Sequence, residues 1–460
     1  MGIERAVQRS FAVLLWVSAA CTAGAIIVGD GLTHGATVLL LVVALAAQAT
    51  LVVRAGRRRE RSGLNRRAVL AASGLVLLVA VLVPPRGSHD LWSYAMYGRI
   101  VSHHHASPFV HRPSEYTSDP WLHHVDRGWR HTRSVYGPAF VAVSAVITFV
   151  ARVPLVARLL FQGLAAAAIF GILLLIDRRT RDPVAVACIG LHPIIAFEVV
   201  NGGHNDALVG LAVLAAVLLV TRERWVWAGL VLALGVLVKA VVLLPFAALA
   251  VWTWRRYGVR AAASLAAAGT SLVVVAYALA GGRAALAPLA AARLQESRAS
   301  LWSLPKYWIT ADLVDDGWRG KTAGLVARHL VSSWSLLVVL GLAVALVVGR
   351  FKDPAPALAA GGATLAYLLA AAYVLPWYVV WALPVLALQW RAGVARLAAI
   401  HASLLLIAYQ YNPGPHLDAL QRALRLTVRG AQAFEVVAIL ALLAVALARA
   451  LGRRPHPVLE

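Results

Sequence analysis

The 460-residue chain is 61% hydrophobic and only 14% charged, which excludes a water-soluble core, since soluble domains are nearer a quarter charged. Its formal net charge of +23 suggests nucleic-acid binding, but the arginines fall in short loops between apolar runs, as they do in membrane proteins. We therefore expect no nucleic-acid partner and expect the lipid bilayer to surround the chain.

Long apolar segments recur from one end of the chain to the other. Clear examples are Phe11–Val28, Val38–Val53, Ala261–Ala280, Leu336–Val348 and Val436–Ala448. About 20 apolar residues span the ~30 Å hydrocarbon layer as a helix, and these runs lack the alternation of barrel strands. We predict an all-α, polytopic membrane bundle with about 13–15 membrane segments.

The first apolar run follows Arg5 and Arg9 but lacks a convincing cleavage site, and a second apolar run comes directly after it. This pattern indicates a retained membrane anchor rather than a signal peptide. Cys21 and Cys188 both lie inside apolar segments and form no CxxC or zinc pattern, so cysteine indicates no function.

Arginine-rich loops predict the orientation of the chain. They occur at 54–67, 222–224, 255–260, 350–352, 391–396 and 453–454. Placing them in the cytoplasm puts the remaining long loops outside, namely 86–136, 281–330 and 411–430. These outer loops carry most of the non-membrane Trp, Tyr, His and Asp residues, and loops on a rigid scaffold commonly carry function.

Two segments conflict with a simple count of crossings. The segment 137–151 is short and ends near Pro154, while three arginines follow the next span, so we expect 137–151 to be re-entrant or not to cross the membrane fully. Segment 226–252 contains Lys239 among mostly apolar residues. We expect two short helices that meet near Lys239 at a tip facing the outside, because this arrangement keeps the basic loops on both sides of the segment in the cytoplasm.

Asp90 begins the first long outer loop, shortly after an apolar run ends. We expect it at the membrane–water boundary, where a carboxylate can face a lipid headgroup. The alternative is an ordinary helix N-cap, because Asp-Leu-Trp-Ser is a plausible helix start. The run His103–His105 suggests a metal site, but consecutive histidines point in different directions and no acidic partner stands at ligand spacing. We therefore expect no bound metal.

The segment Asn201–Asp206 is a short outer loop between two apolar spans. Its glycines allow a tight turn, and His204, Asn205 and Asp206 then open the next helix. Simple helix capping and a polar site at the membrane surface are both open at this point.

Lys239 stands at membrane depth, where a lysine costs ~2.5–3.5 kcal/mol and normally has a partner or a pathway. Its ammonium would suit an anionic phosphate, and snorkelling to the interface is the alternative. Pro376–Pro384 contains two tryptophans and a tyrosine. They form either part of an aromatic belt or a platform on which a sugar stacks.

Together these segments resemble actinobacterial polyprenol-phosphate-mannose-dependent α-mannosyltransferases, integral membrane glycosyltransferases of the GT-C superfamily. The segments Asp90–Tyr94, Gly98-Arg99, Ser107–Phe109, Asp119–Trp121 and Tyr136–Pro138 look like the family's first outer loop; Gly203–Leu208, Val238–Phe246 and Pro376–Pro384 follow in its order. The resemblance covers about residues 70–390 and is nearest to the α-(1→6)-mannosyltransferases that build lipomannan cores. The His103–His105 run departs from the family's glycine-containing turn, which leaves the acceptor open.

The resemblance implies a role for each candidate residue. Asp90 would be the general base, and the leaving phosphate would be bound by Lys239, His204 and Arg133. The residues expected to bind substrate are Trp92, Tyr94, Tyr136, Asn205, Asp206, Trp377 and Tyr378. The partners implied are a polyprenyl-phosphate sugar donor and a glycolipid or glycan acceptor, without a cofactor or a metal.

The resemblance therefore predicts an inverting mannosyltransferase of the cell membrane whose site faces the extracytoplasmic side. The alternatives are the same fold with another lipid-phosphate sugar such as arabinofuranose, and a transporter or flippase of a lipid-linked sugar. We divide the chain into an N-terminal two-span hairpin with a basic cytoplasmic loop (1–67), a GT-C-like catalytic membrane module (68–390), and C-terminal spans with a cytoplasmic tail (391–460).

Overall fold

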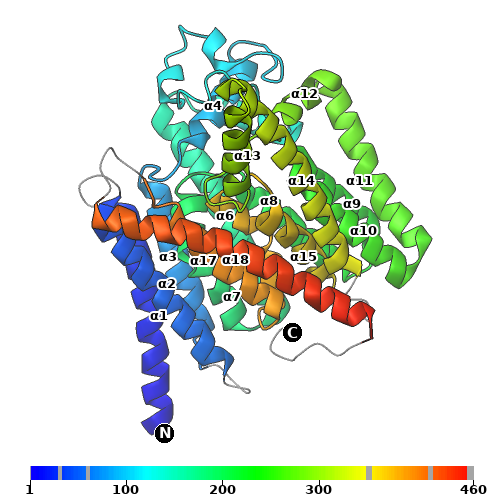
Figure 1. The fold of residues 1–460 in the computed structure, drawn as a ribbon. Coiled ribbons are helices and arrows are strands. Elements are labelled where there is room, and N and C mark those ends of the chain that lie inside the picture. Colours follow the sequence, from blue (N-terminus) through cyan, green and yellow to red (C-terminus); the bar gives the residue numbers. More distant parts are fainter. Residues whose placement is uncertain (1, 30–33, 58–62, 349–354, 413–417, 453–460) are drawn as a thin grey trace.

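The computed structural model describes residues 2–29, 34–57, 63–348, 355–412 and 418–452 (Figure 1). All regular structure in these ranges is helical, which confirms the predicted fold class. The arginines at 58, 59, 61, 350, 453 and 454 and the lysine at 352, which the topology prediction used, lie outside the described residues.

The helices of the first half lead from the N-terminal hairpin into the module that carries the site. They are α1 (Gly2–Val28), α2 (His34–Gly56), α3 (Arg66–Leu82), α4 (Asp90–Ser102), α5 (Pro138–Val150), α6 (Pro154–Thr180), α7 (Pro183–Gly190) and α8 (Asp206–Val220). Proline opens α5, α6 and α7, where its fixed φ suits the first helical turn and its missing N–H costs nothing. A π-helix, η3 (Ile195–Val200), separates α7 from α8.

The second half contributes the remaining helices. They are α9 (Trp225–Val238), α10 (Leu243–Tyr257), α11 (Val259–Leu279), α12 (Arg283–Ala292), α13 (Ser303–Asp315), α14 (Gly320–Val348), α15 (Pro356–Ala370), α16 (Leu383–Ala387), α17 (Gly393–Ala408) and α18 (Ala419–Ala450). Short 3₁₀ turns lie at Pro113–Glu115, Leu122–His124, Ala240–Val242 and Pro376–Trp381, the last named η5. A long helix, α18, crosses obliquely over the bundle (Figure 1).

Six helices in the described ranges are long and apolar enough to cross a membrane, and five shorter apolar helices accompany them. The polytopic membrane bundle is therefore the architecture of this chain, while the predicted number of 13 to 15 segments stays a prediction. Helix α5 has 13 residues, which at 1.5 Å per residue is about 20 Å and too short to cross the ~30 Å hydrocarbon layer. This agrees with the expectation that 137–151 does not fully cross.

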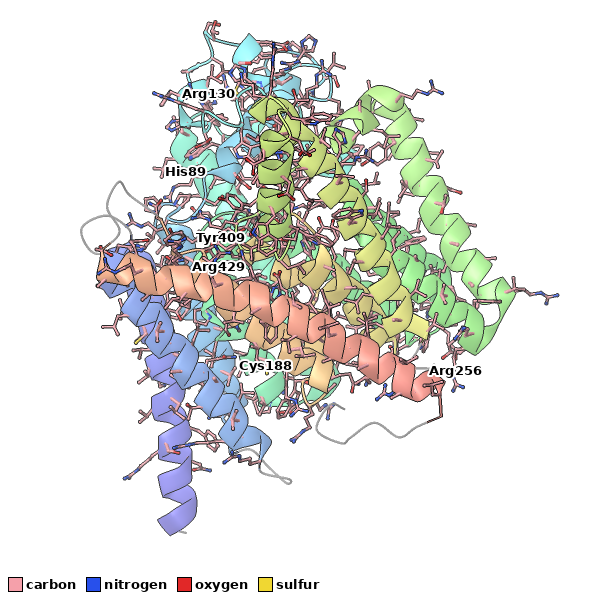
Figure 2. All side chains as sticks on the ribbon, in the orientation of Figure 1. His89, Arg130, Cys188, Arg256, Tyr409 and Arg429 are labelled. Atoms are coloured by element: carbon pink, nitrogen blue, oxygen red, sulfur yellow. The ribbon has the colours of Figure 1, made fainter. Side chains whose placement is uncertain are left out.

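Some of the segments that the arginine count assigns to different sides of the membrane lie in different parts of the molecule. The segment between α4 and α5 and the start of α12 lie at the upper end in Figure 1, while the N-terminus and the α10–α11 turn lie at the lower end. Figure 2 places Arg130 of the aromatic outer loop and Arg256 of a basic loop at these opposite ends. Which end faces the cytoplasm stays a prediction from the arginine count.

Candidate functional site

Asp90 is the first residue of α4, and the capping position before the helix belongs to His89, whose side chain makes no capping hydrogen bond. The Asp90 side chain is 16% exposed, and its backbone N–H donates to Ser88 Oγ at 3.2 Å. The carboxylate is thus not the helix cap that the sequence left open. Burial raises the pKa of Asp90 to about 6, against the opposing effect of the Lys239 ammonium.

His204 brings a second polar group to within contact of Asp90. Its Nδ1 lies 3.9 Å from Asp90 Oδ2, 4.0 Å from Asp206 Oδ2 and 3.3 Å from the Tyr94 hydroxyl. The ring is fully buried and stacks on Trp377 with centroids 3.9 Å apart. Burial lowers the pKa of His204 well below its usual range, so the imidazole is neutral at physiological pH.

Lys239 follows the last residue of α9, and its Nζ lies 2.8 Å from Asp206 Oδ1. The indole N–H of Trp381 donates to the same carboxylate oxygen at 2.6 Å. The ammonium also lies 4.0 Å from the Tyr378 ring centroid, a cation–π contact. Lys239 therefore lies at the tip between two short helices, as predicted, but it is paired rather than snorkelling.

The 204–206 motif contains buried polar atoms that find no hydrogen-bond partner within the described part of the chain. They are His204 Nε2, Asn205 Nδ2, Asn205 Oδ1 and Asp206 Oδ2, and Ser93 Oγ on α4 is another. Buried polar groups are normally paired, because leaving one unpaired costs about 1–3 kcal/mol. Four such atoms in three consecutive residues point to a polar ligand that pairs with some of them.

Aromatic rings enclose this cluster. Trp377 and Tyr378 belong to η5 and are 7% and 6% exposed, and Tyr378 stacks on Trp381 with centroids 4.1 Å apart. The Tyr136 ring packs edge-on against Tyr94 at 4.8 Å, and its centroid lies 6.0 Å from Lys239 Nζ. The aromatic residues predicted to stack on a sugar therefore lie beside Lys239, which is predicted to bind the phosphate.

Two predicted residues make their contacts elsewhere. Trp92 stacks on His124 of the outer loop with centroids 4.4 Å apart. Arg133 is exposed and makes no polar contact with the cluster within the described ranges. Trp381 was not among the predicted site residues, although it belongs to the same aromatic motif; the hydrogen bond to Asp206, 175 positions earlier, gives it its place in the cluster.

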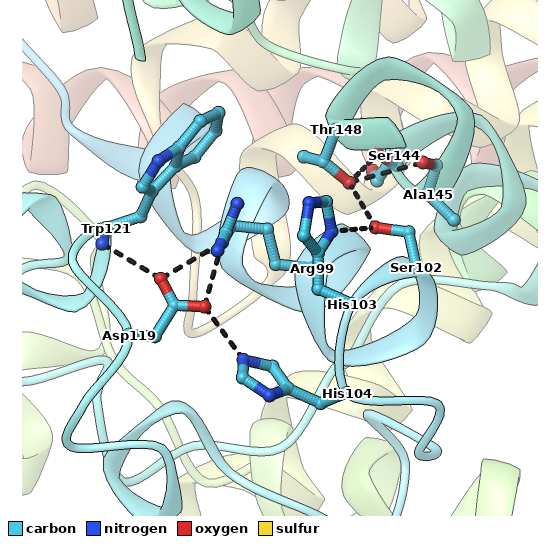
Figure 3. Close-up of polar contacts among 9 residues, drawn as sticks. All are labelled: Arg99, Ser102, His103, His104, Asp119, Trp121, Ser144, Ala145 and Thr148. Carbon is cyan, nitrogen blue, oxygen red and sulfur yellow. Dashed lines mark hydrogen bonds and ion pairs between the residues drawn. The ribbon is translucent and has the colours of Figure 1, made fainter. Parts of the chain in front are cut away.

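The side chains of His103 and His104 contact different partners (Figure 3). His103 Nδ1 contacts Ser102 Oγ at 2.8 Å, while His104 Nε2 contacts Asp119 Oδ2 at 2.8 Å. Asp119 also accepts from the Arg99 guanidinium at 2.8 Å, so this network anchors the outer loop to the end of α4. Within the described ranges, no three or more His, Cys, Asp or Glu side chains are arranged so that they could hold a metal ion.

The apolar helices of the chain and its family match together define an integral membrane glycosyltransferase. Residues 10–256 match the alpha-(1→6)-mannopyranosyltransferase N-terminal domain family, so the chain belongs to that family. It is 25% identical over 376 residues to alpha-(1→6)-mannopyranosyltransferase A of Mycobacterium tuberculosis, covering 76% of this chain and 71% of that protein. It is also 27% identical over 183 residues to alpha-(1→6)-mannopyranosyltransferase A of Corynebacterium glutamicum, covering 37% of each. The family resemblance drawn from the sequence is thereby confirmed.

Proposed function

We propose that this protein transfers mannose from polyprenyl-phosphate mannose to a glycolipid or glycan acceptor on the extracytoplasmic face, forming an α-mannoside. The observation that carries the proposal is the convergence of Asp90, His204, Asp206 and Lys239 at one aromatic-lined cluster. These residues come from three segments that are far apart in the sequence, namely the start of α4, the 204–206 motif and the α9–α10 junction, and a purely structural bundle has no need of such a group.

Asp90 is the general base in this proposal. Its carboxylate takes the proton of the acceptor hydroxyl while that oxygen bonds to the anomeric carbon. The bond from the anomeric carbon to the phosphate oxygen breaks at the same time, and its electron pair leaves with the polyprenyl phosphate. Attack opposite a β-linked phosphate inverts the centre, and base catalysis of this kind contributes about 10²–10⁴-fold.

Lys239 and His204 are the proposed ligands of the departing phosphate. The ammonium has three hydrogens and gives one to Asp206 Oδ1, so it retains donors for the growing charge on the leaving oxygen. His204 is neutral and acts as a hydrogen-bonding group rather than as a charge. Arg133 is proposed as an additional cation that reaches the phosphate from the outer loop.

The aromatic residues are proposed to hold the sugars. Trp377, Tyr378 and Tyr136 would line the sugar site with the ring surface that His204, Trp381 and Lys239 leave uncovered, while Asn205 and Asp206 supply hydrogen bonds to hydroxyls. Tyr94 orients His204, and Trp92 lies toward the outer loop, where the acceptor enters.

The purified protein in lipid vesicles, supplied with labelled donors and a mannosylated glycolipid acceptor, tests the proposal. We expect an α-mannoside from polyprenyl-phosphate mannose and none from GDP-mannose or polyprenyl-phosphate arabinofuranose. Transfer of arabinose instead of mannose would show that the protein is an arabinosyltransferase and would contradict the proposed donor sugar. Movement of the labelled lipid across the bilayer without a new glycosidic bond would make the protein a flippase and overturn it.

A further inference from the structure

Asn201 is a buried amide at the junction of three segments that lead to the site. It directly follows η3 and is fully buried. The loop that it opens reaches His204 three residues later. Single π-helical turns are frequent at functional sites, where they displace a side chain from the regular helical register. Neither the proposed chemistry nor the predicted site residues use Asn201.

The Asn201 side chain bonds to both sides of the turn between α3 and Asp90. Its Nδ2 lies 3.1 Å from Ala80 O, 3.0 Å from Val83 O and 3.1 Å from Pro84 O, while its Oδ1 accepts from the Arg86 N–H at 2.9 Å. An amide carries two donor hydrogens and an acceptor oxygen, and this one uses both functions on a single turn. It therefore satisfies carbonyls that α3 leaves unpaired at its end.

Gln162 of α6 completes the junction from the other side. Its Nε2 lies 3.0 Å from both Ala80 O and Val83 O and 2.7 Å from the backbone carbonyl of Asn201. The Gln162 side chain is likewise fully buried, and Arg158 donates to its Oε1 at 3.0 Å. The two amides thus tie the end of α3 to α6 and to the start of the His204 loop.

From these contacts we infer that Asn201 is a positioning residue that holds the Asp90 segment and the His204 loop at a fixed separation. Arg86 is four residues before Asp90, and Asn201 is three residues before His204. The hydrogen bond between Arg86 and Asn201 therefore joins two short segments, and at their other ends His204 Nδ1 lies 3.9 Å from Asp90 Oδ2. Gly87, which follows Arg86, packs closely on Glu198, since a Cβ at this position would lie 3.1 Å from Glu198 Oε2. The inference rests on the proposed function for its kinetic consequence, but the geometry can be tested without substrate.

The kinetic test compares wild type with Asn201→Ala and Asn201→Ser. Loss of the amide lets the turn relax and the base shift, and a misplacement of about 1 Å costs on the order of 10²-fold in rate. We expect kcat for mannosyl transfer to fall about 10²-fold in the alanine variant and less in the serine variant, with a nearly unchanged KM for the donor. Gln48→Ala removes another buried side-chain amide, on α2, and serves as the matched control with kcat near wild type.

The second readout is the titration of the Asp90 carboxyl, obtained from the difference in infrared spectra between each protein and its Asp90→Asn counterpart. The groups that face Asp90 are Lys239, Asp206, His204 and Asp126. In wild type we expect a midpoint near 6, and in Asn201→Ala a lower midpoint because the loosened carboxyl gains water.

Unchanged kcat and an unchanged midpoint in Asn201→Ala would overturn the inference. The inference would also fail if Gln48→Ala lowered kcat as much as Asn201→Ala and both losses followed from a smaller amount of folded protein. If wild type transfers no mannose but the midpoint still shifts in Asn201→Ala, the proposed function fails while the positioning role holds. If mannose is transferred and neither quantity responds to Asn201→Ala, only the positioning role fails.

Discussion

The ionisation of Asp90 depends mainly on its burial and on the charges of Lys239 and Asp206. Burial and the Asp206 carboxylate raise its pKa, while Lys239 lowers it, with a result of about 6. A general base acts only in its ionised form, so activity is present above this pKa and is lost as the pH falls through about 6. We expect kcat/KM to decline about tenfold per pH unit below about 6, measured as initial rates in buffers of constant ionic strength. A flat profile down to about pH 4.5 would contradict the assignment. A carboxyl with a pKa of about 6 is already half protonated at about pH 6 and is mostly protonated at about pH 4.5.

The Lys239–Asp206 pair is expected to matter for folding as well as for binding. The Asp206 side chain is fully buried, so Lys239→Met would strand a charge and cost about 3–5 kcal/mol. We expect a clearly lower unfolding temperature in detergent for Lys239→Met, measured by intrinsic tryptophan fluorescence. The double variant Lys239→Met/Asp206→Asn should recover part of the loss, since it removes the stranded charge. Equal unfolding temperatures for the single and double variants would show that the two side chains are not coupled.

At the scale of elements, the packing of α4 against α5 depends on a glycine. A Cβ at Gly98 would lie 2.3 Å from the backbone oxygen of Ser144 and 2.8 Å from Thr148 Oγ1, so the helices touch through their backbones there. We expect Gly98→Ala to push α5 away and destabilise the protein by about 1–3 kcal/mol. Gly163→Ala on α6 is the control, because a Cβ there meets nothing within 4 Å. Similar unfolding temperatures for the two variants would contradict this close packing.

Sequence reasoning reached the elements of the site but not their pairing. The short helices around Lys239 and the polar turn at His204 follow from apolar length and glycine placement. That Lys239 pairs with Asp206, 33 positions away, depends on how α9 packs on α8. The Trp381–Asp206 bond depends on how η5 packs on α8, where a Cβ at Gly210 would lie 2.4 Å from the Val380 carbonyl oxygen. Such long-range contacts have no local signature. The same reason explains why Asn201 was not named as a site residue and why Trp381 was expected only as part of the sugar platform, not as a partner of Asp206.

At the scale of the whole molecule, the separation of arginine-rich loops from aromatic loops makes sidedness testable. The test uses two variants, Arg127→Cys in the loop between α4 and α5 and Arg222→Cys in the α8–α9 turn. In both variants the native Cys21 and Cys188 are replaced, so that labelling reports the accessibility of one position only. In intact cells a membrane-impermeant maleimide should label the cysteine at 127 and label that at 222 only after permeabilisation. The reverse pattern would place the site on the cytoplasmic face and reverse the orientation inferred from the arginines.

The composition alone predicted a helical membrane bundle, because apolar length and the lack of strand alternation leave no other spanning solution. The number of crossings stays a prediction, because α5, α9 and α10 have 13, 14 and 15 residues and are each shorter than the ~30 Å hydrocarbon layer, so that their length alone does not say whether they cross. Their depth is set by contacts with neighbouring helices, which a hydropathy count does not include.

The most direct test of the account is transfer of mannose from polyprenyl-phosphate mannose by the Asp90→Asn variant, compared with wild type at equal amounts of folded protein. Asparagine keeps the size of the side chain and removes the proton acceptor. The account predicts that kcat falls by about 10²–10⁴-fold while the donor still binds. Turnover near the wild-type rate would remove Asp90 as the base, and with it the mechanism assigned to the cluster of His204, Asp206 and Lys239.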